Sequence, residues 1–278
     1  MVDNSSDRPS KSDYPALTPE EDAKRLRGLK SANGIGPWFG YRVFRRLILL
    51  AAATRMKGEI ACLHNLPQPE PNYYPTRYRR RDSGKVSDYP FVVAPNHQHV
   101  LDIPLTGLIR RPMAWPSKPD FVRWGWLKWI NQIMGCVPFM RDVDWIKRPQ
   151  YQKVVYTKYE MKDVLNSALR RGQPVVLYPQ GTRRDDDDLS EAKLGAMYAA
   201  IRAGVPLVPL AIYGVGKADE KRRTRFLRRY CAVAIVMEPI FPGDYMGGDR
   251  MVAQAMQRDW QLAIEKGREL AHTLQSTM

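Results

Sequence analysis

The sequence has few of the residues that build disulfide frameworks or metal clusters. It contains three cysteines in 278 residues, Cys62, Cys136 and Cys231, which lie far apart and in apolar stretches. An odd number of scattered cysteines excludes a disulfide scaffold and predicts reduced core residues in a cytoplasmic protein. Only four histidines are present, and His64 and His272 lie in no ligand-like cluster.

Long apolar runs are also missing. No stretch reaches the roughly 18 uncharged apolar residues that a membrane-spanning helix needs. The best N-terminal run, residues 47–54, is bounded by Arg46 and Arg55. Residues 1–34 are polar, so no signal peptide is predicted, and residues 1–18 are expected to form a disordered tail.

Acidic residues are too few to balance the basic ones. The chain has 44 Lys and Arg against 29 Asp and Glu, a net charge of +15. This excess implies an anionic partner: nucleic acid, an acidic membrane surface or a phosphorylated substrate. Residues 217–229 are rich in Lys and Arg, but no RNP-like block or helix-turn-helix accompanies them. A nucleic-acid partner is therefore not favoured.

Residues 19–64 are predicted to form an N-terminal helical membrane-association motif. Its central part, residues 35–57, mixes Trp, Phe and Leu with several arginines. Such a helix can lie in a membrane interface with its apolar face in the lipid. The alternative is an ordinary amphipathic helix that packs on the core and keeps its arginines in water.

The remainder alternates between strand-like and helix-like segments. Apolar runs predict strands at residues 91–94, 113–116, 174–178, 207–213 and 232–237. Helical spacing predicts helices that begin near Asp102 and that cover residues 121–134, 151–171, 189–203 and 249–275, with Gly172 and Gly204 as stops. This order predicts an α/β fold with a mixed, mostly parallel central sheet flanked by helices.

The stretch from Pro95 to Asp102 is the strongest candidate for chemistry. It holds His97, His99 and Asp102 directly after the predicted strand. Open α/β sheets place their sites at the carboxyl ends of strands. There His97 would act as a general base, and Asp102 would fix its tautomer and stabilise the imidazolium.

Two other interpretations of this stretch remain open. Asp102 could be a helix N-cap while His97 packs in a turn. Alternatively, His97, His99 and Asp102 could ligate a metal ion. A serine nucleophile is disfavoured because the chain has no G-x-S-x-G elbow.

Four blocks in order resemble the glycerolipid acyltransferases, in particular the 1-acylglycerol-3-phosphate acyltransferase family. Members of that family carry four sequence blocks in a fixed order along the chain: N-H-x-x-x-x-D, G-x-x-F-x-R, F-P-E-G-T-R and V-P-x-V-P. Here they correspond to residues 96–102, 135–141, 178–183 and 205–209. The resemblance assigns residues 65–278 to an α/β acyltransferase domain.

The resemblance implies an O-acyltransferase that moves a fatty acyl group to the sn-2 hydroxyl of 1-acylglycerol-3-phosphate. The donor would be acyl-CoA or acyl carrier protein, with no further cofactor and no metal. The enzyme would work at the cytoplasmic face of an anionic membrane, as a peripheral or monotopic protein. Besides catalytic His97 and Asp102, the implied substrate-binding residues are Gly135, Phe139, Arg141, Gln180, Gly181, Thr182 and Arg183, of which Arg141 and Arg183 would hold the acceptor phosphate.

Gln180 stands where the family usually has glutamate. Glutamine keeps an acceptor oxygen but loses the charge, which leaves the acceptor open: another lysophospholipid or phosphorylated acceptor is the alternative substrate. A second alternative is a non-catalytic basic protein that binds nucleic acid or membranes, but it leaves the four ordered blocks unexplained.

Overall fold

The computed structural model describes residues 56–67, 89–97, 102–106, 109, 113–117, 136–139, 156–170, 172–181, 189, 192–214 and 230–277. The chain divides into two compact units, which are taken separately below. The smaller comprises residues 1–41 and 114–165, and the larger comprises residues 42–113 and 166–278.

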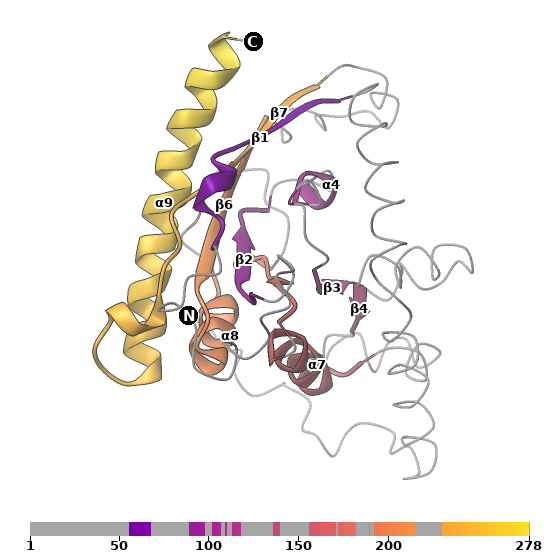
Figure 1. The fold of residues 1–278 in the computed structure, drawn as a ribbon, viewed down its shortest axis with the longest axis vertical. Coiled ribbons are helices and arrows are strands. Elements are labelled where there is room, and N and C mark those ends of the chain that lie inside the picture. The colour runs from indigo at the N-terminus through magenta and orange to yellow at the C-terminus, as the bar shows by residue number, and fades with distance from the viewer. Residues whose placement is uncertain are drawn as a thin grey trace, which may run out of the picture. The chain divides into compact units, whose positions relative to one another are not determined.

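A five-stranded sheet forms the centre of the larger unit (Figure 1). Its strands are β1 (Met56–Ala61), β2 (Val92–Pro95), β5 (Val175–Val176), β6 (Leu207–Tyr213) and β7 (Tyr230–Val236). They lie in the order β1-β7-β6-β2-β5, and only the β6–β7 pair is antiparallel. The predicted mixed, mostly parallel sheet is confirmed.

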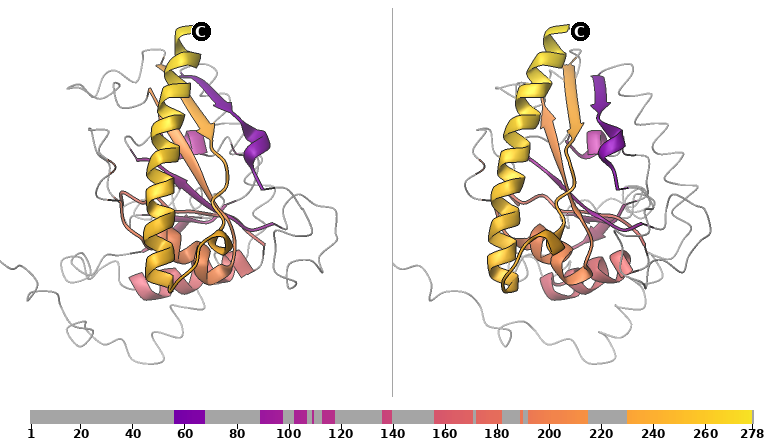
Figure 2. Two further views of the ribbon diagram at one scale, coloured as in Figure 1. Left: turned by 90° about the vertical axis from the view of Figure 1, so that its left-hand side faces the viewer. Right: turned by 60° about the vertical axis from the view of Figure 1, so that its left-hand side comes forward.

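Helices lie on both sides of this sheet. The long helix α9 (Asp249–Thr277) packs on β6, β7 and the shorter α8 (Gly195–Ala203). The short α4 (Asp102–Thr106) lies on the opposite side from α9 (Figures 1 and 2). Two 3-10 turns, η2 (Leu63–Asn65) and η7 (Pro242–Asp244), complete the described elements of this unit.

The core lies between the sheet and α9. Residues 91–94, the last three of them in β2, are fully buried, as expected for a strand with neighbours on both edges and helices on its faces. The predicted apolar face of α9 is confirmed, because Val252, Met256, Trp260 and Ile264 are all buried. The indole of Trp260 donates a 2.8 Å hydrogen bond to the Ala94 carbonyl, which ties α9 to β2 near the end of the strand.

The predicted helical motif over residues 19–64 is wrong in its last part. Residues 56–61 form β1, which pairs in parallel with β7 from Tyr230 to Ile235. Gly58 disfavours a helix here, and β7 would otherwise expose an unpaired edge. Residues 1–55 of the predicted tail and motif lie outside the described residues.

The described residues of the smaller unit include two short parallel strands, β3 (Trp115–Ser117) and β4 (Cys136–Pro138). Strand β3 begins two residues later and ends one residue later than the predicted strand at 113–116, whereas β4 was not predicted. The bridge between Phe139 and Tyr156 continues this parallel pairing. The predicted helix over residues 121–134 lies outside the described part of the chain.

Helix α7 (Lys158–Arg170) begins later than the predicted 151–171. Its start is set by a capping box: the Thr157 N–H donates to Glu160 Oε2 at 2.8 Å, and the Glu160 N–H donates to Thr157 Oγ1 at 3.2 Å. Upstream, Tyr156 pairs as a strand rather than a helix. The predicted stop holds, since Gly172 has a φ of 86°.

Helix α8 likewise begins at Gly195 rather than at the predicted Leu189. Before α8, the Lys193 N–H donates to the Pro179 carbonyl at 2.7 Å. This N–H is therefore bonded to a neighbouring loop rather than within a helix. The predicted end is confirmed, because Gly204 adopts the left-handed conformation that closes α8.

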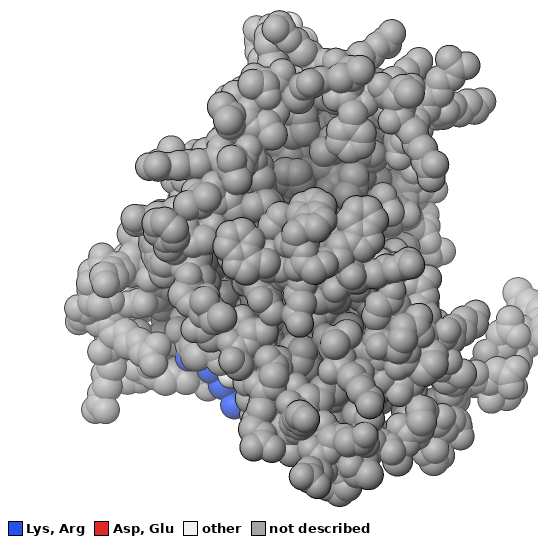
Figure 3. Space-filling model, turned by 90° about the vertical axis from the view of Figure 1, so that its right-hand side faces the viewer, with Lys and Arg blue, Asp and Glu red and all other residues white. Residues whose placement is uncertain are grey.

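Within the described ranges, no helix is both long and apolar enough to span a membrane. The arginine-rich residues 77–81 and 217–229 lie outside these ranges. On the face drawn in Figure 3, the visible atoms of described basic residues form a short row at the lower left.

Close packing of α9 on the sheet predicts a large effect of one methyl group. A Cβ at Gly267 would lie 2.4 Å from Ala211 Cβ and 3.0 Å from Met237 Sδ. Because the backbone of β6 cannot move aside without a cost in free energy, Gly267→Ala should lower the free energy of unfolding by about 1–3 kcal/mol in urea titrations. The matched control is Gly195→Ala, where nothing lies within 4 Å. If both variants unfold at the same urea concentration, this packing account is incorrect.

Candidate active site

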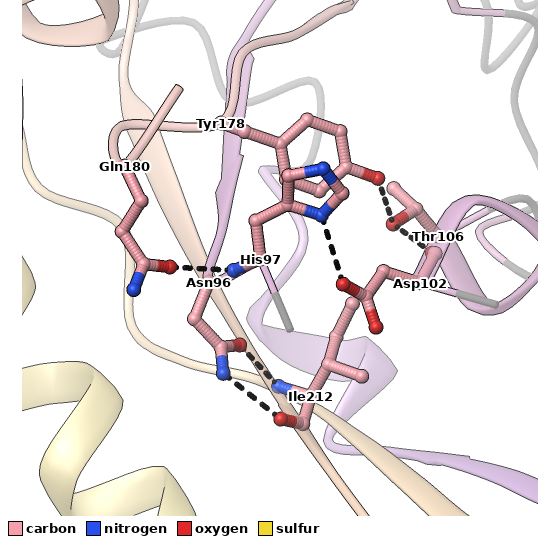
Figure 4. Close-up of polar contacts among 7 residues, drawn as sticks. All are labelled: Asn96, His97, Asp102, Thr106, Tyr178, Gln180 and Ile212. Carbon is pink, nitrogen blue, oxygen red and sulfur yellow. Dashed lines mark hydrogen bonds and ion pairs between the residues drawn. The ribbon is translucent and has the colours of Figure 1, made fainter. Parts of the chain in front are cut away.

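Two adjacent parallel strands bring the candidate site together. His97 lies just beyond the C-terminal end of β2, and Tyr178 and Gln180 lie just beyond that of β5. Because β2 and β5 pair in parallel, both connections leave the same edge of the sheet. Asp102, the first residue of α4, completes the group (Figure 4).

Asn96 anchors the chain immediately before His97. Its side-chain amide donates to the Ile212 carbonyl at 2.9 Å and its oxygen accepts from the Ile212 N–H at 2.7 Å. The side chain is 3% exposed, so both hydrogen bonds lie in the interior. This double contact substitutes for strand pairing at the point where β2 ends, and it fixes the position from which His97 projects.

His97 and Asp102 are in direct contact. The ring Nδ1 lies 2.9 Å from Asp102 Oδ2, and the side chain of Asp102 is fully buried while that of His97 is 16% exposed. The carboxylate can only accept when it is ionised, so the neutral ring carries its proton on Nδ1 and leaves Nε2 as an acceptor. The predicted contact between base and orienting group is confirmed.

A tight turn from the β5 connection covers His97 from another side. The Gly181 N–H donates to the Tyr178 carbonyl at 3.0 Å, with Pro179 second and Gly181 fourth in the turn. Gly181 has a φ of 70°, a left-handed conformation that favours glycine. The turn directs Gln180 Oε1 at the His97 N–H, which donates to it at 2.6 Å.

The arrangement is suited to proton transfer rather than to covalent catalysis by the protein. A partly exposed imidazole with a buried carboxylate behind it has a fixed tautomer and can act as a general base. Burial raises the pKa of the Cys136 thiol to about 12, which makes it a poor nucleophile near neutral pH. Among the described residues, no group of three His, Cys, Asp or Glu side chains could hold a metal ion.

Several predicted site residues cannot be compared with this geometry. His99, Gly135, Arg141, Thr182 and Arg183 lie outside the described residues. Phe139 is half-buried and bridges to Tyr156 within the smaller unit. The structure therefore brings together His97, Asp102 and Gln180, with Gly181 in the adjoining turn.

Sequence reasoning missed three residues that support the site. Asn96 was part of the quoted block, but no role was predicted for it. Tyr178 likewise belongs to a quoted block with no role predicted for it, although its ring centroid lies 4.3 Å from that of His97. Thr106 Oγ1 donates to the Asp102 carbonyl at 2.8 Å within α4, a contact with no distinctive sequence signal.

Comparison with known proteins agrees with the resemblance noted in the sequence. The family model described as Acyltransferase matches residues 67–213. Over 159 residues the chain is 31% identical to the chloroplastic 1-acyl-sn-glycerol-3-phosphate acyltransferase LPAT1 of Arabidopsis thaliana, covering 55% of this chain and 40% of that protein. It is 27% identical over 169 residues to the human 1-acyl-sn-glycerol-3-phosphate acyltransferase beta, covering 60% and 57%. The chain spans about half the length of the curated relatives it matches.

A solved structure supports the fold independently. The crystal structure of the 1-acyl-sn-glycerophosphate (LPA) acyltransferase PlsC from Thermotoga maritima aligns with a TM-score of 0.51 and 18% identity. The alignment covers 88% of this chain and 83% of that one. At this identity the likeness concerns the fold alone.

The double hydrogen bond of Asn96 predicts a coupled loss of stability and activity. Asn96→Ala would leave the buried Ile212 N–H and carbonyl without their partner and would free the chain before His97. We expect the free energy of unfolding to fall by about 2–3 kcal/mol, together with turnover in an acyl-transfer assay. Asn65→Ala is the control, since it removes a single, partly buried hydrogen bond to the Val236 carbonyl away from His97. A fully stable Asn96→Ala protein would contradict the anchoring role.

Proposed function

The chain belongs to the acyltransferase family, and on that premise we propose that it transfers a fatty acyl group to the sn-2 hydroxyl of 1-acylglycerol-3-phosphate. The product would be phosphatidic acid, an intermediate of phospholipid biosynthesis. The observation that carries the proposal is the 2.9 Å contact between His97 and a fully buried Asp102 at the sheet edge. The names of the curated relatives support the choice of acceptor.

The proposed reaction proceeds in two steps. His97 Nε2 takes the proton of the acceptor hydroxyl while the oxygen attacks the carbonyl carbon of an acyl thioester, forming a C–O bond and a tetrahedral oxyanion. When the oxyanion collapses, the C–S bond breaks and the thiolate leaves with the proton from the imidazolium. Asp102 stabilises that imidazolium in between. The protein supplies no nucleophile, and the step requires no metal or further cofactor.

The acceptor phosphate needs fixed positive charge, and by resemblance Arg141 and Arg183 would supply it. Guanidinium groups match phosphate with two parallel donors and stay charged near neutral pH. Gly135, Phe139 and Thr182 would shape the same acceptor site. The donor would be acyl-CoA or acyl carrier protein.

The excess of basic residues supports a membrane location for this chemistry. A net charge of +15 attracts the protein to anionic lipid, where a lysophospholipid acceptor resides. We place the enzyme at the cytoplasmic face of such a membrane, bound peripherally or by the segment before β1. Nucleic acid is not proposed as a partner, because charge alone would leave the His97 site unexplained.

The direct test replaces the proposed base. With acyl-CoA and lysophosphatidic acid as substrates, His97→Ala should reduce kcat by at least about 100-fold while circular dichroism shows an intact fold. His64→Ala is the matched control, since His64 is exposed in η2 and away from the sheet edge. Undiminished turnover in His97→Ala would rule out the mechanism, and an inactive wild-type protein would rule out this substrate pair.

Gln180 provides a separate test of acceptor choice. Its Oε1 is already used by the His97 N–H and its side chain is 3% exposed, which supports a positioning role. Gln180→Glu keeps that acceptor oxygen but introduces a buried charge, so we expect a several-fold lower kcat and an unchanged ranking of lysophospholipid acceptors. The measurement compares lysophosphatidic acid with lysophosphatidylcholine and lysophosphatidylglycerol. A reversed ranking would show that residue 180 reads the acceptor headgroup.

A further inference from the structure

Tyr178 contacts His97 and, through its hydroxyl, Thr106 of the helix that carries Asp102. Its ring centroid lies 4.3 Å from that of His97, with the two planes inclined by 35°. Its hydroxyl lies 3.5 Å from Thr106 Oγ1, at the long end of the hydrogen-bonding range. Figure 4 shows the ring lying across one face of the imidazole, with the hydroxyl directed toward α4.

From this geometry we infer that Tyr178 is a positioning residue that holds the His97 ring against Asp102. The inference rests on the proposed function, which makes His97 the base. A hydrogen bond at Nδ1 fixes one edge of the imidazole, but the ring can still tilt about that contact. The Tyr178 ring blocks the tilt on one face and thereby sets the direction in which Nε2 points.

The turn that carries Tyr178 explains how this contact is kept rigid. Tyr178 and Gln180 lie two positions apart in a turn closed by the Gly181 N–H. One member of the turn packs on the imidazole, and the other accepts from the His97 N–H at 2.6 Å. The same short turn therefore contacts both the ring and the backbone of His97, and this limits how far the ring can move relative to its own backbone.

The hydroxyl adds a link that a phenylalanine would lack. Thr106 has a single hydroxyl proton and donates it to the Asp102 carbonyl at 2.8 Å. Tyr178 is then the donor in the contact between the two hydroxyls. The resulting chain from Tyr178 through Thr106 to the backbone of Asp102 connects the β5 turn to α4. The family block has phenylalanine at this place, so the link is a feature of this chain.

The ring also has an electrostatic role during turnover. The face of an aromatic ring carries negative electrostatic potential and attracts a cation placed over it. The imidazolium that forms when His97 takes the acceptor proton would lie against this face. Removing the ring should therefore slow the step that creates the imidazolium, whereas substrate binding should be little affected.

The test compares Tyr178→Leu, which removes the ring, with Tyr178→Phe, which removes only the hydroxyl. Tyr178→Leu should lower kcat about 10- to 100-fold with KM within about twofold, because misplacing the base affects the chemical step. Tyr178→Phe should lower kcat only a few-fold. Combining it with Thr106→Val should cost no more than the larger single effect, since both changes break one link. Tyr198→Leu in α8 is the matched control for loss of a tyrosine ring.

A spectroscopic measurement keeps the inference testable if activity is lost for other reasons. The chain has only four histidines, so the His97 ring protons can be assigned in an NMR spectrum by their absence in His97→Ala. Tyr178→Leu should remove the ring-current shift of these protons, and Tyr178→Phe should keep it. Wild-type kcat in Tyr178→Leu, or His97 signals unmoved by it, would overturn the inference. An inactive wild type with the predicted NMR shifts would overturn only the proposed function.

Discussion

The contact between His97 and Asp102 is the constraint to which the rest of the site conforms. Asp102 is fully buried, so its carboxylate is oriented by protein rather than by water, whereas the His97 side chain is 16% exposed. Because Nδ1 faces the buried carboxylate, Nε2 lies on the side of the ring away from Asp102. A buried carboxylate is unfavourable unless it is well paired, and the His97 ring, with Nδ1 2.9 Å from Oδ2, is a partner that offsets this cost.

Support for this pair comes from three separate strands. Asn96 fixes the end of β2 to β6 through Ile212, and the turn after β5 supplies Tyr178 and Gln180. In addition, the indole N–H of Trp260 in α9 donates a hydrogen bond to the Ala94 carbonyl, which joins the long helix to β2. The parallel arrangement of β2, β5 and β6 is what places these contacts at one edge. Stability of the core and placement of the base therefore depend on the same few backbone positions.

Much of the fold and the contact between His97 and Asp102 could be predicted from the sequence, because the patterns that indicate them are local. Runs of buried apolar residues marked β2 and β6, the periodicity of Val252, Met256 and Trp260 marked α9, and Gly204 marked the end of α8. The spacing of His97 and Asp102 predicted their contact because the loop and first turn of a helix between them have limited reach.

The errors arose where long-range pairing decides the outcome. Residues 56–61 are a strand because β7, some 170 residues later, offers an edge to pair with. The helix predicted from Leu189 starts at Gly195 because Lys193 bonds to the turn at Pro179. The same limitation hid Tyr178, since its importance comes from contacts with His97 and Thr106, which are far away in the sequence. A local sequence pattern identifies helices and strands. Which strands pair, where a helix begins and which residues support the site depend on contacts between these elements.

The central claim is that Asp102 holds His97 in one tautomer with Nε2 free to accept a proton. Nitrogen-15 NMR of the histidine side chains measures this directly, because protonated and unprotonated ring nitrogens have distinct shifts. The account predicts that the neutral ring of His97 carries its proton on Nδ1, and that Asp102→Asn disturbs this preference. A neutral ring protonated on Nε2, or a preference that survives Asp102→Asn unchanged, would contradict it.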